Sequence, residues 1–126
     1  MEIRPKTGNA FSLEVTAIVG PWKRSAEESR ALAAAAAAYC AKQVIVPRAE
    51  GQTLVPQELK VPRGAGYYYR ATDPRDSLSL NEYRHLCAGA IVLRDFLIVF
   101  NFFQHESDEI AFREALLTLS SMELTR

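Results

Sequence analysis

Two chemically versatile side chains, His85 and Cys87, lie two residues apart in the second half of the chain. A histidine beside a cysteine can act as base and nucleophile, or the two can be ligands of a metal. Both fall in a probable strand, where a spacing of two places both side chains on one face. A catalytic set also needs an orienting third group, and a structural zinc site needs four ligands. The sequence supplies neither beyond the pair, so we predict a strand-end histidine next to a buried thiol, with no catalytic, cofactor or metal role.

Two other short segments contain residue types that are used in catalysis or in ligand binding. Residues 105–109 hold a histidine and three acids, which could form a hydrolytic or metal cluster. They lie just before an apolar helix, however, where acids stabilise the positive end of the helix dipole. Residues 63–66 are glycine-rich but precede a strand, not the helix terminus that a phosphate loop requires. We predict helix capping for the first segment and a turn for the second.

Aromatic residues give the sequence its strongest indication of a binding surface. Alternation along a strand places Tyr67 and Tyr69 on one face, and Tyr68 with Arg70 on the other. A phenol combines an apolar body with a polar tip, and such side chains are enriched at protein interfaces. Trp22 is followed by two basic residues, a combination that also favours interfaces. We predict a partner-binding surface at Trp22, Tyr67 and Tyr69; packing within the core is the alternative for each of them.

Length, charge and hydropathy restrict the class of protein. A chain of 126 residues fits one domain, which we expect over residues 1–126 with an ordered core at about residues 11–122. Fifteen basic and fifteen acidic side chains cancel, so no net field attracts nucleic acid or an anionic membrane. No apolar run reaches the roughly 18 residues that a membrane span needs. Residues 1–9 lack the pattern of a secretory signal, although a signal could have been removed, so export stays open.

The two cysteines, Cys40 and Cys87, are too few for a disulfide framework and lie on different predicted elements. One interpretation is that both are small buried hydrophobic residues, as free cysteines often are. The other is a single disulfide bridge between them.

The first half of the chain predicts a strand followed by a helix. Residues 11–19 alternate apolar and polar side chains, which indicates a strand with one buried and one solvated face. Ser25 and Glu28 form the pattern of a capping box, which starts a helix that continues to about residue 42 or 43. The residues expected on its buried side are Leu32, Ala36, Tyr39 and Cys40.

The second half predicts four strands and a final helix. An edge strand or a broken strand is expected within residues 53–61, because Pro56 inside this range and Pro62 just after it cannot donate to a ladder. Further strands are expected at residues 67–72, 82–93 and 96–104, with a tight reversal at residues 94–95. In the final helix, the expected buried stripe is Phe112, Leu116, Leu119 and Met122. The element order β-α-β-β-β-β-α predicts an α+β fold, an antiparallel sheet packed by two helices.

Residues 66–73, residues 82–95 and the closing helix together resemble a known group of proteins. These are small uncharacterised bacterial proteins, commonly exported, in which a tyrosine-rich strand precedes a strand with a Gly-Ala-hydrophobic sequence, a tight hairpin, an apolar strand and a terminal helix. Their architecture is similar to the PsbP-like α/β/α sandwich of DcrB-like lipoproteins and of chaperones for secreted effectors. The resemblance covers about residues 11–122 and implies a periplasmic or exported location.

PsbP-like domains mostly hold other molecules, so the resemblance implies a non-enzymatic binding or accessory protein. We therefore expect contact with a protein partner, no cofactor, no nucleic acid, and a monomer or homodimer. The alternative is a secretion-effector chaperone or immunity-type partner that shields an apolar segment. A metal or cysteine-dependent enzyme centred on His85 and Cys87 ranks last, because no set of catalytic residues is evident.

Overall fold

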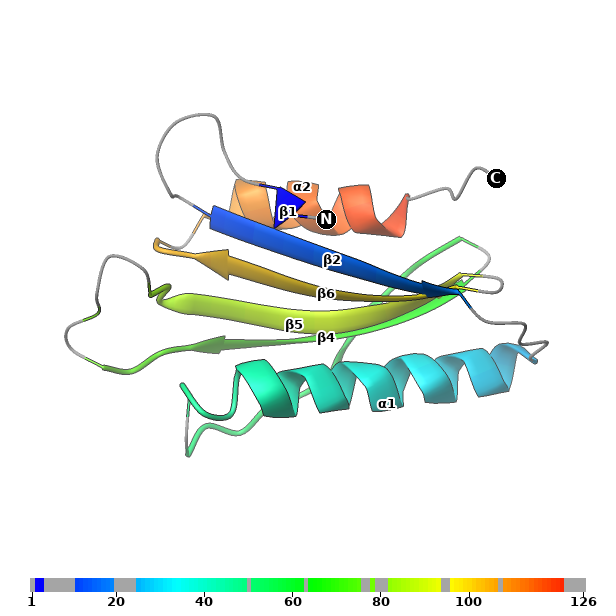
Figure 1. Ribbon diagram of the computed structural model, residues 1–126, viewed down its shortest axis with the longest axis horizontal. Helices are drawn as coiled ribbons and strands as arrows, with labels where there is room; N and C mark the ends of the chain where they lie inside the picture. The colour runs from blue at the N-terminus through cyan, green and yellow to red at the C-terminus, as the bar shows by residue number, and fades with distance from the viewer. Residues whose placement is uncertain are drawn as a thin grey trace.

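The structure, a computed structural model, describes residues 2–3, 11–19, 25–49, 51–62, 64–75, 78, 82–93, 96–106 and 108–121. In chain order its elements are β1 Glu2–Ile3, β2 Phe11–Val19, α1 Ala26–Val44, β3 Gln57–Leu59, β4 Gly64–Thr72, β5 His85–Leu93, β6 Phe96–Gln104 and α2 Glu109–Ser120. The strands form one antiparallel sheet in the order β1-β2-β6-β5-β4-β3. The sheet lies between the two helices, with α1 on one face and α2 on the other (Figure 1).

The predicted fold class, α+β with an antiparallel sheet packed by two helices, is confirmed. No sequence pattern predicts β1, a two-residue strand that pairs with β2. The predicted edge strand is β3, the last strand of the sheet on the side away from β1. Helix α1 ends at Val44, and residues 45–48 form a turn.

The hairpin of β5 and β6 forms the centre of the sheet. Their nine residues pair without interruption, from His85 opposite Gln104 to Leu93 opposite Phe96. The reversal predicted at residues 94–95 lies outside the described residues, but the two residues that flank it face each other. This register aligns the ends of the two strands, so His85 and Gln104 lie side by side at one end of the sheet.

The α2 face of the sheet carries the larger part of the core. Apolar side chains of β2, β3, β5 and β6 gather there around Phe112 and Leu119 of α2. Asp108 caps α2, because its carboxylate accepts a hydrogen bond from the Ala111 amide at 3.0 Å. The predicted stripe is confirmed, with Phe112 and Leu119 buried and Leu116 half-buried, while Met122 lies outside the described residues.

The α1 face is packed with small side chains. The predicted capping box is present: the Ser25 hydroxyl accepts from the Glu28 amide, and the Glu28 carboxylate accepts from the Ser25 amide. The residues of α1 that pack on the sheet are Ala33, Ala37 and Ala41. Alanines let the helix axis approach the sheet closely, and Ile45 completes the contact at the helix end.

The predicted buried side of α1 was wrong by one position. Tyr39 is 65% exposed, while Leu32, Ala36 and Cys40 flank the contact and are half-buried. In a run of alanines the faces of a helix differ little in hydropathy, so the prediction placed the larger side chains on the buried face, which was wrong. Burial on β2 also differs from the expected alternation at Ser12, which is buried, and at Ala17, which is exposed.

The turn predicted at residues 63–66 was also wrong, because β4 already begins at Gly64. A Cβ atom at Gly64 would collide with the main-chain oxygen of Val92 on the neighbouring strand. Glycine therefore permits close packing here instead of breaking the strand.

No helix among the described residues is both long and apolar enough to span a membrane.

Candidate functional site

Two of the three predicted partner-binding residues lie on the α1 face of β4. Tyr67 packs beside Ala33 and Val92, and Tyr69 packs near Ala41 and Ile45. Both tyrosines are half-buried. Trp22, the third, lies outside the described residues.

A groove opens between the first turns of α1 and the β3 edge of the sheet. We call it the α1–β3 groove; its volume is about 560 Å³.

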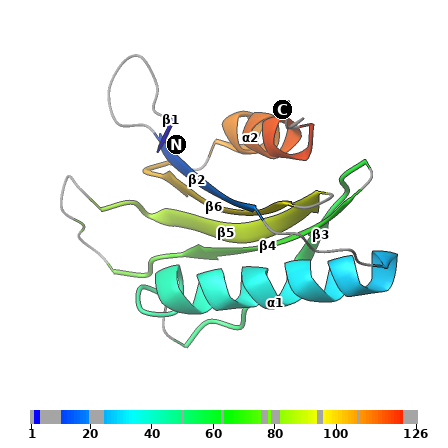
Figure 2. The ribbon, with the colours of Figure 1, turned by 45° about the vertical axis from the view of Figure 1, so that its right-hand side comes forward.

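 Ser29 and Arg30 of α1 form one wall of the groove, and residues 58–61 form the other. Tyr67 lies in its floor. Figure 2 shows β3 and the amino-terminal part of α1 at the same end of the molecule.

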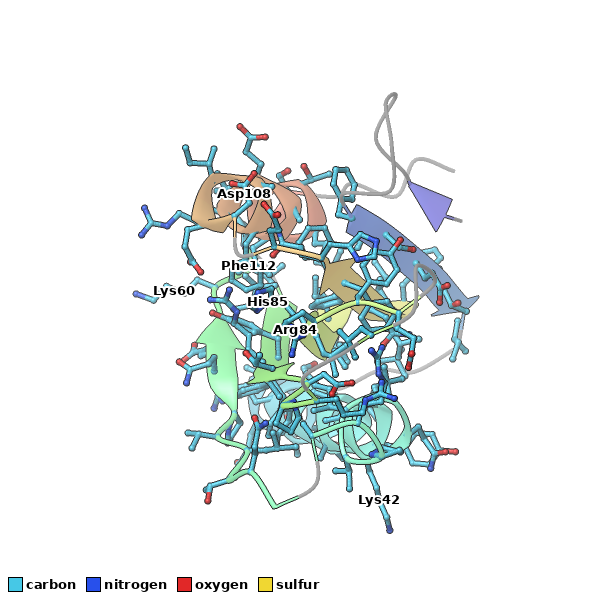
Figure 3. The ribbon with its side chains drawn as sticks, turned by 90° about the vertical axis from the view of Figure 1, so that its left-hand side faces the viewer. Lys42, Lys60, Arg84, His85, Asp108 and Phe112 are labelled. Carbon is cyan, nitrogen blue, oxygen red and sulfur yellow. The ribbon has the colours of Figure 1, made fainter. Side chains whose placement is uncertain are left out.

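The second cavity, which we call the α2 cavity, lies at the other end of the sheet under the first turn of α2. Its volume is about 460 Å³. Its lining comes from Gln52, from the ends of β4, β5 and β6, and from α2. The lining residues include Arg70, His85, Cys87, Phe102, Glu109 and Phe112. Figure 3 shows His85 and Arg84 at this end of the sheet, below Phe112 of α2.

His85 and Cys87 line the α2 cavity together, on one face of β5 as their spacing predicts. An acid, Glu109, lines the same cavity, and no pattern in the sequence places it beside this pair. Burial raises the pKa of the Cys87 thiol to about 12, with Arg70 opposing the rise. The thiol is therefore protonated near neutral pH, the form that is neither a nucleophile nor a metal ligand.

His85 is held in its neutral form. Burial lowers the pKa of the imidazole, and the positive charges of Arg70 and Arg84 lower it further. Glu109 acts in the opposite direction. Near neutral pH the imidazole can both donate and accept a hydrogen bond, which suits it to a polar ligand.

Arg70, a charged group of the α2 cavity, is held by a ring and by a carboxylate. Its guanidinium carbon lies 3.6 Å from the centroid of the Phe112 ring. Its two terminal nitrogens donate to the two carboxylate oxygens of Glu109, at 2.9 and 3.4 Å. The sequence contained no signal for this pair, because its members are 39 residues apart.

The disulfide considered for Cys40 and Cys87 is not present, and both cysteines are free. Cys87 is buried on the α2 face of the sheet, and Cys40 is half-buried on α1, which covers the opposite face. The interpretation as small hydrophobic residues is therefore confirmed for Cys87 and holds in part for Cys40.

The two thiols are expected to react at very different rates in the native protein. Near neutral pH, iodoacetamide should modify Cys40 at least about a hundredfold faster than Cys87, because Cys87 is inaccessible and has almost no thiolate. Mass spectrometry of timed samples measures both rates, and urea-unfolded protein, in which both thiols should react, is the control. Equal native rates would contradict this description and would restore cysteine chemistry as a candidate.

The capping role predicted for residues 105–109 is confirmed for Asp108. Asp108 is the N-cap of α2, and His105 stacks on Tyr83 with ring centroids 4.3 Å apart. Within the described part of the chain, no group of three or more histidine, cysteine, aspartate or glutamate side chains is arranged to hold a metal.

A buried acid just after β4 was not predicted as part of any site. Asp73 directly follows β4, and its side chain is completely buried. Arg75 donates to both carboxylate oxygens, at 2.7 to 3.1 Å, and Arg48 donates at 3.2 Å. These hydrogen bonds and charges hold the pKa of Asp73 well below its usual range. We call Asp73, Arg48, Arg75 and Arg84 the Asp73 cluster.

The Asp73 cluster holds together the two ends of the connection between β4 and β5. The Arg84 guanidinium donates to the carbonyl oxygens of Asp73 and Arg75, and the Asp73 amide donates to the carbonyl of Arg84 at 2.7 Å. Arg75 also pairs with Glu82. Arg48 reaches from the turn after α1, so the cluster joins that helix to the strand ends that carry Thr72 and His85.

No family model, curated protein or solved structure matches this chain.

Proposed function

We propose that this protein is a non-enzymatic binding protein that holds an extended segment of a protein partner in the α1–β3 groove. The observation that carries the proposal is the groove itself, of about 560 Å³, with Tyr67 in its floor. A hollow of this size between a helix and a sheet is of the kind that accepts side chains or a short peptide. The fold is consistent with the PsbP-like sandwich that the sequence resembles, and such domains mostly hold other molecules.

The walls of the groove favour a peptide in extended conformation. β3 is the edge strand, and an extended peptide can align with a sheet edge through its main chain. Gly64 and Gly66 of β4 also line the groove. Glu58 and Lys60 are exposed charges on this edge, and charges of that kind disfavour unspecific strand pairing. Selectivity would then come from the groove and from Tyr67.

Two changes to the residues that line the groove should weaken peptide binding. Ser29→Tyr places a large side chain in the helix wall, and Tyr67→Ala removes the aromatic floor. For peptides selected from a displayed random library on the wild-type protein, we expect each change to weaken binding by about tenfold, the size of a hot-spot loss. Fluorescence anisotropy measures the affinity. Trp22→Ala tests the third predicted residue in the same assay.

The matched control is Ala35→Tyr, which adds the same side chain at an exposed position of α1 that does not line the groove. It should leave peptide affinity unchanged. Selected peptides that bind wild type, Ser29→Tyr and Tyr67→Ala equally well would contradict the proposed groove.

A second candidate function, a chaperone that shields an apolar segment, has one observation in its favour. Ile110 and Leu117 are 73% and 67% exposed and lie seven residues apart on α2, on one side of the helix. The same peptide selection distinguishes the two functions. Apolar peptides whose binding is lost in the double variant Ile110→Ser/Leu117→Ser, but kept in Ser29→Tyr, would favour the chaperone.

A further inference from the structure

The two edges of the sheet differ in how they are protected from other chains. β3, at one edge, has three residues, and the exposed Pro56, Glu58 and Lys60 lie in it or beside it. Short length, charge and proline are the features by which natural edge strands avoid unspecific pairing. The edge at β3 therefore has this protection.

The opposite edge, formed by β1 and β2, lacks these features along the second half of β2. The outer side of β2 pairs with β1 at Leu13 and Glu14, and no described strand pairs with that side at residues 16–18, which we call the β2 edge. Figure 1 shows β2 at the margin of the sheet, with β1 beside its first part. Residues 15–19 include no charged residue, proline or glycine. An uncharged edge of this kind is a template for a further strand.

The side chains of the β2 edge are exposed on both faces of the sheet. Leu13 and Val15 belong to the core on the α2 face, so alternation places Thr16 and Ile18 on the α1 face and Ala17 on the α2 face. Thr16 and Ala17 are exposed, and Ile18 is 43% exposed. A strand that approached this edge would therefore reach the main chain and find accessible side chains on either face.

The β2 edge is complementary to itself. In an antiparallel pairing with Ala17 opposite the same residue of a second copy, Thr16 of each copy faces Ile18 of the other. Each β-branched side chain then meets another, which is a favourable cross-strand pair, and no like charges face each other. A two-fold axis perpendicular to the sheet makes the two contacts equivalent and keeps both α1 faces on one side. A pairing centred nearer the start of β2 would instead collide with β1.

We propose that the β2 edge pairs with the β2 edge of a second copy of this chain, which joins the two sheets into one continuous sheet. The pairing is short, so the dimer should dissociate on dilution. The symmetric match of Thr16 with Ile18 favours a second copy over an unrelated extended segment. This edge is on the other side of the sheet from β3 and the α1–β3 groove, so the inference is independent of the function proposed above.

Sedimentation equilibrium of the full chain, from about 10 to 1,000 μM, should show a monomer–dimer equilibrium. Thr16→Lys/Ile18→Lys places a lysine opposite a lysine on both sides of the axis, so it should weaken the dimer by at least about 100-fold. Thr16→Lys/Ile18→Glu changes the same positions but places opposite charges face to face. Its dimer affinity should stay within about tenfold of wild type. The contrast between the two variants depends on the proposed register.

Two controls separate the β2 edge from other causes of association. Ala35→Lys/Ala38→Lys adds the same two charges at exposed positions of α1, and Ile110→Ser/Leu117→Ser removes the exposed apolar side chains of α2. Both should leave the dimer affinity within about threefold of wild type. Amide spectra of each variant establish that the fold is retained.

A cross-linking experiment tests the register without added charge. In a Cys40→Ser background, Ala17→Cys should form a disulfide-linked dimer on mild oxidation, because residues directly opposite in an antiparallel pair have Cα atoms about 4.5 to 5.5 Å apart, within disulfide range. Thr16→Cys faces Ile18 rather than its own counterpart, so it should cross-link at least about tenfold more slowly. Cys87 is buried and should stay reduced in both variants.

Three outcomes would overturn the proposal. They are a wild-type protein that stays monomeric at the highest concentration, a dimer that Thr16→Lys/Ile18→Lys leaves intact, and equal cross-linking rates at positions 16 and 17. The first would leave the β2 edge to an extended segment of another protein, and the second would place the dimer contact elsewhere. Ser29→Tyr lies in the α1–β3 groove and should not change the dimer, so the two proposals can fail separately.

Discussion

Replacing Asp73 with asparagine should lower the free energy of unfolding by about 3 kcal/mol, the lower end of the range for breaking a buried ion pair. The carboxylate is completely buried, and Arg75 and Arg48 donate hydrogen bonds to it. Asparagine keeps the size of the side chain but loses the charge and one acceptor. The two arginines are partly exposed, at 49% and 25%, so water relieves some of the loss.

Urea unfolding at neutral pH, followed by circular dichroism, measures this change. Glu114→Gln is the matched control, because it removes an exposed carboxylate outside any described ion pair and should shift stability by no more than about 0.5 kcal/mol. A loss below about 1 kcal/mol in Asp73→Asn would show that the Asp73 cluster is not the main constraint on the β4–β5 connection.

The effect should also depend on pH in a defined direction. Because the folded-state pKa of Asp73 lies below its unfolded value, its contribution is present above about pH 4 and is lost as pH falls below that. The stability difference between wild type and Asp73→Asn should therefore shrink between neutral pH and about pH 3. His85 also lowers the stability of the protein below about pH 6.5, because its imidazole binds a proton more readily in the unfolded state. This effect is the same in wild type and in Asp73→Asn, so it cancels in the difference between them.

Local sequence patterns were sufficient for most of the elements. The alternation at Phe11–Val19 and the apolar segment at Phe96–Gln104 gave the bounds of β2 and β6 as the structure has them. The start of α1 followed from Ser25 and Glu28, which are three residues apart. Each of these signals arises from neighbours within one element, where a spacing of two, three or four residues fixes which groups can meet.

The sites required contacts that no local pattern contains. Asp73 meets Arg48 across 25 residues, and Arg70 meets Glu109 across 39. Each pair becomes adjacent only when a helix packs on the sheet in one register. A polar segment that contains a proline is typical of an exposed loop. Apart from the charged residues nearby, the sequence around Asp73 therefore gives no indication that its side chain is buried. For the same reason the cavity that joins His85 and Cys87 with Glu109 could not be predicted from their spacing.

The second large effect is expected at Gly89, in the middle of the central strand β5. Gly89 lies opposite Phe100 of β6, and the Phe100 ring covers it on the α2 face. A Cβ atom at this position would lie 2.5 Å from the Phe100 ring and 2.5 Å from the main-chain oxygen of Tyr67 on β4. The ring could rotate away only into a closely packed core, and the main-chain oxygen is fixed by the sheet.

Gly89→Ala should therefore lower the free energy of unfolding by about 3 kcal/mol, the upper end of the usual cost of overpacking. The alanine gains in intrinsic strand propensity, but that gain is below about 1 kcal/mol and cannot offset two such contacts. Urea unfolding at neutral pH measures the change, and hydrogen exchange should show weaker protection of β5 and β6.

A double-mutant cycle tests the physical cause. Phe100→Leu alone should also destabilise the protein, because it leaves unfilled volume beside Gly89. If the ring is the main obstacle, Gly89→Ala/Phe100→Leu should be more stable than the sum of the single changes implies, by about 1 kcal/mol or more. Strict additivity would instead assign the cost to the Tyr67 oxygen. That result would mean that the spacing of β4 and β5, rather than the Phe100 ring, requires a glycine at the centre of the sheet.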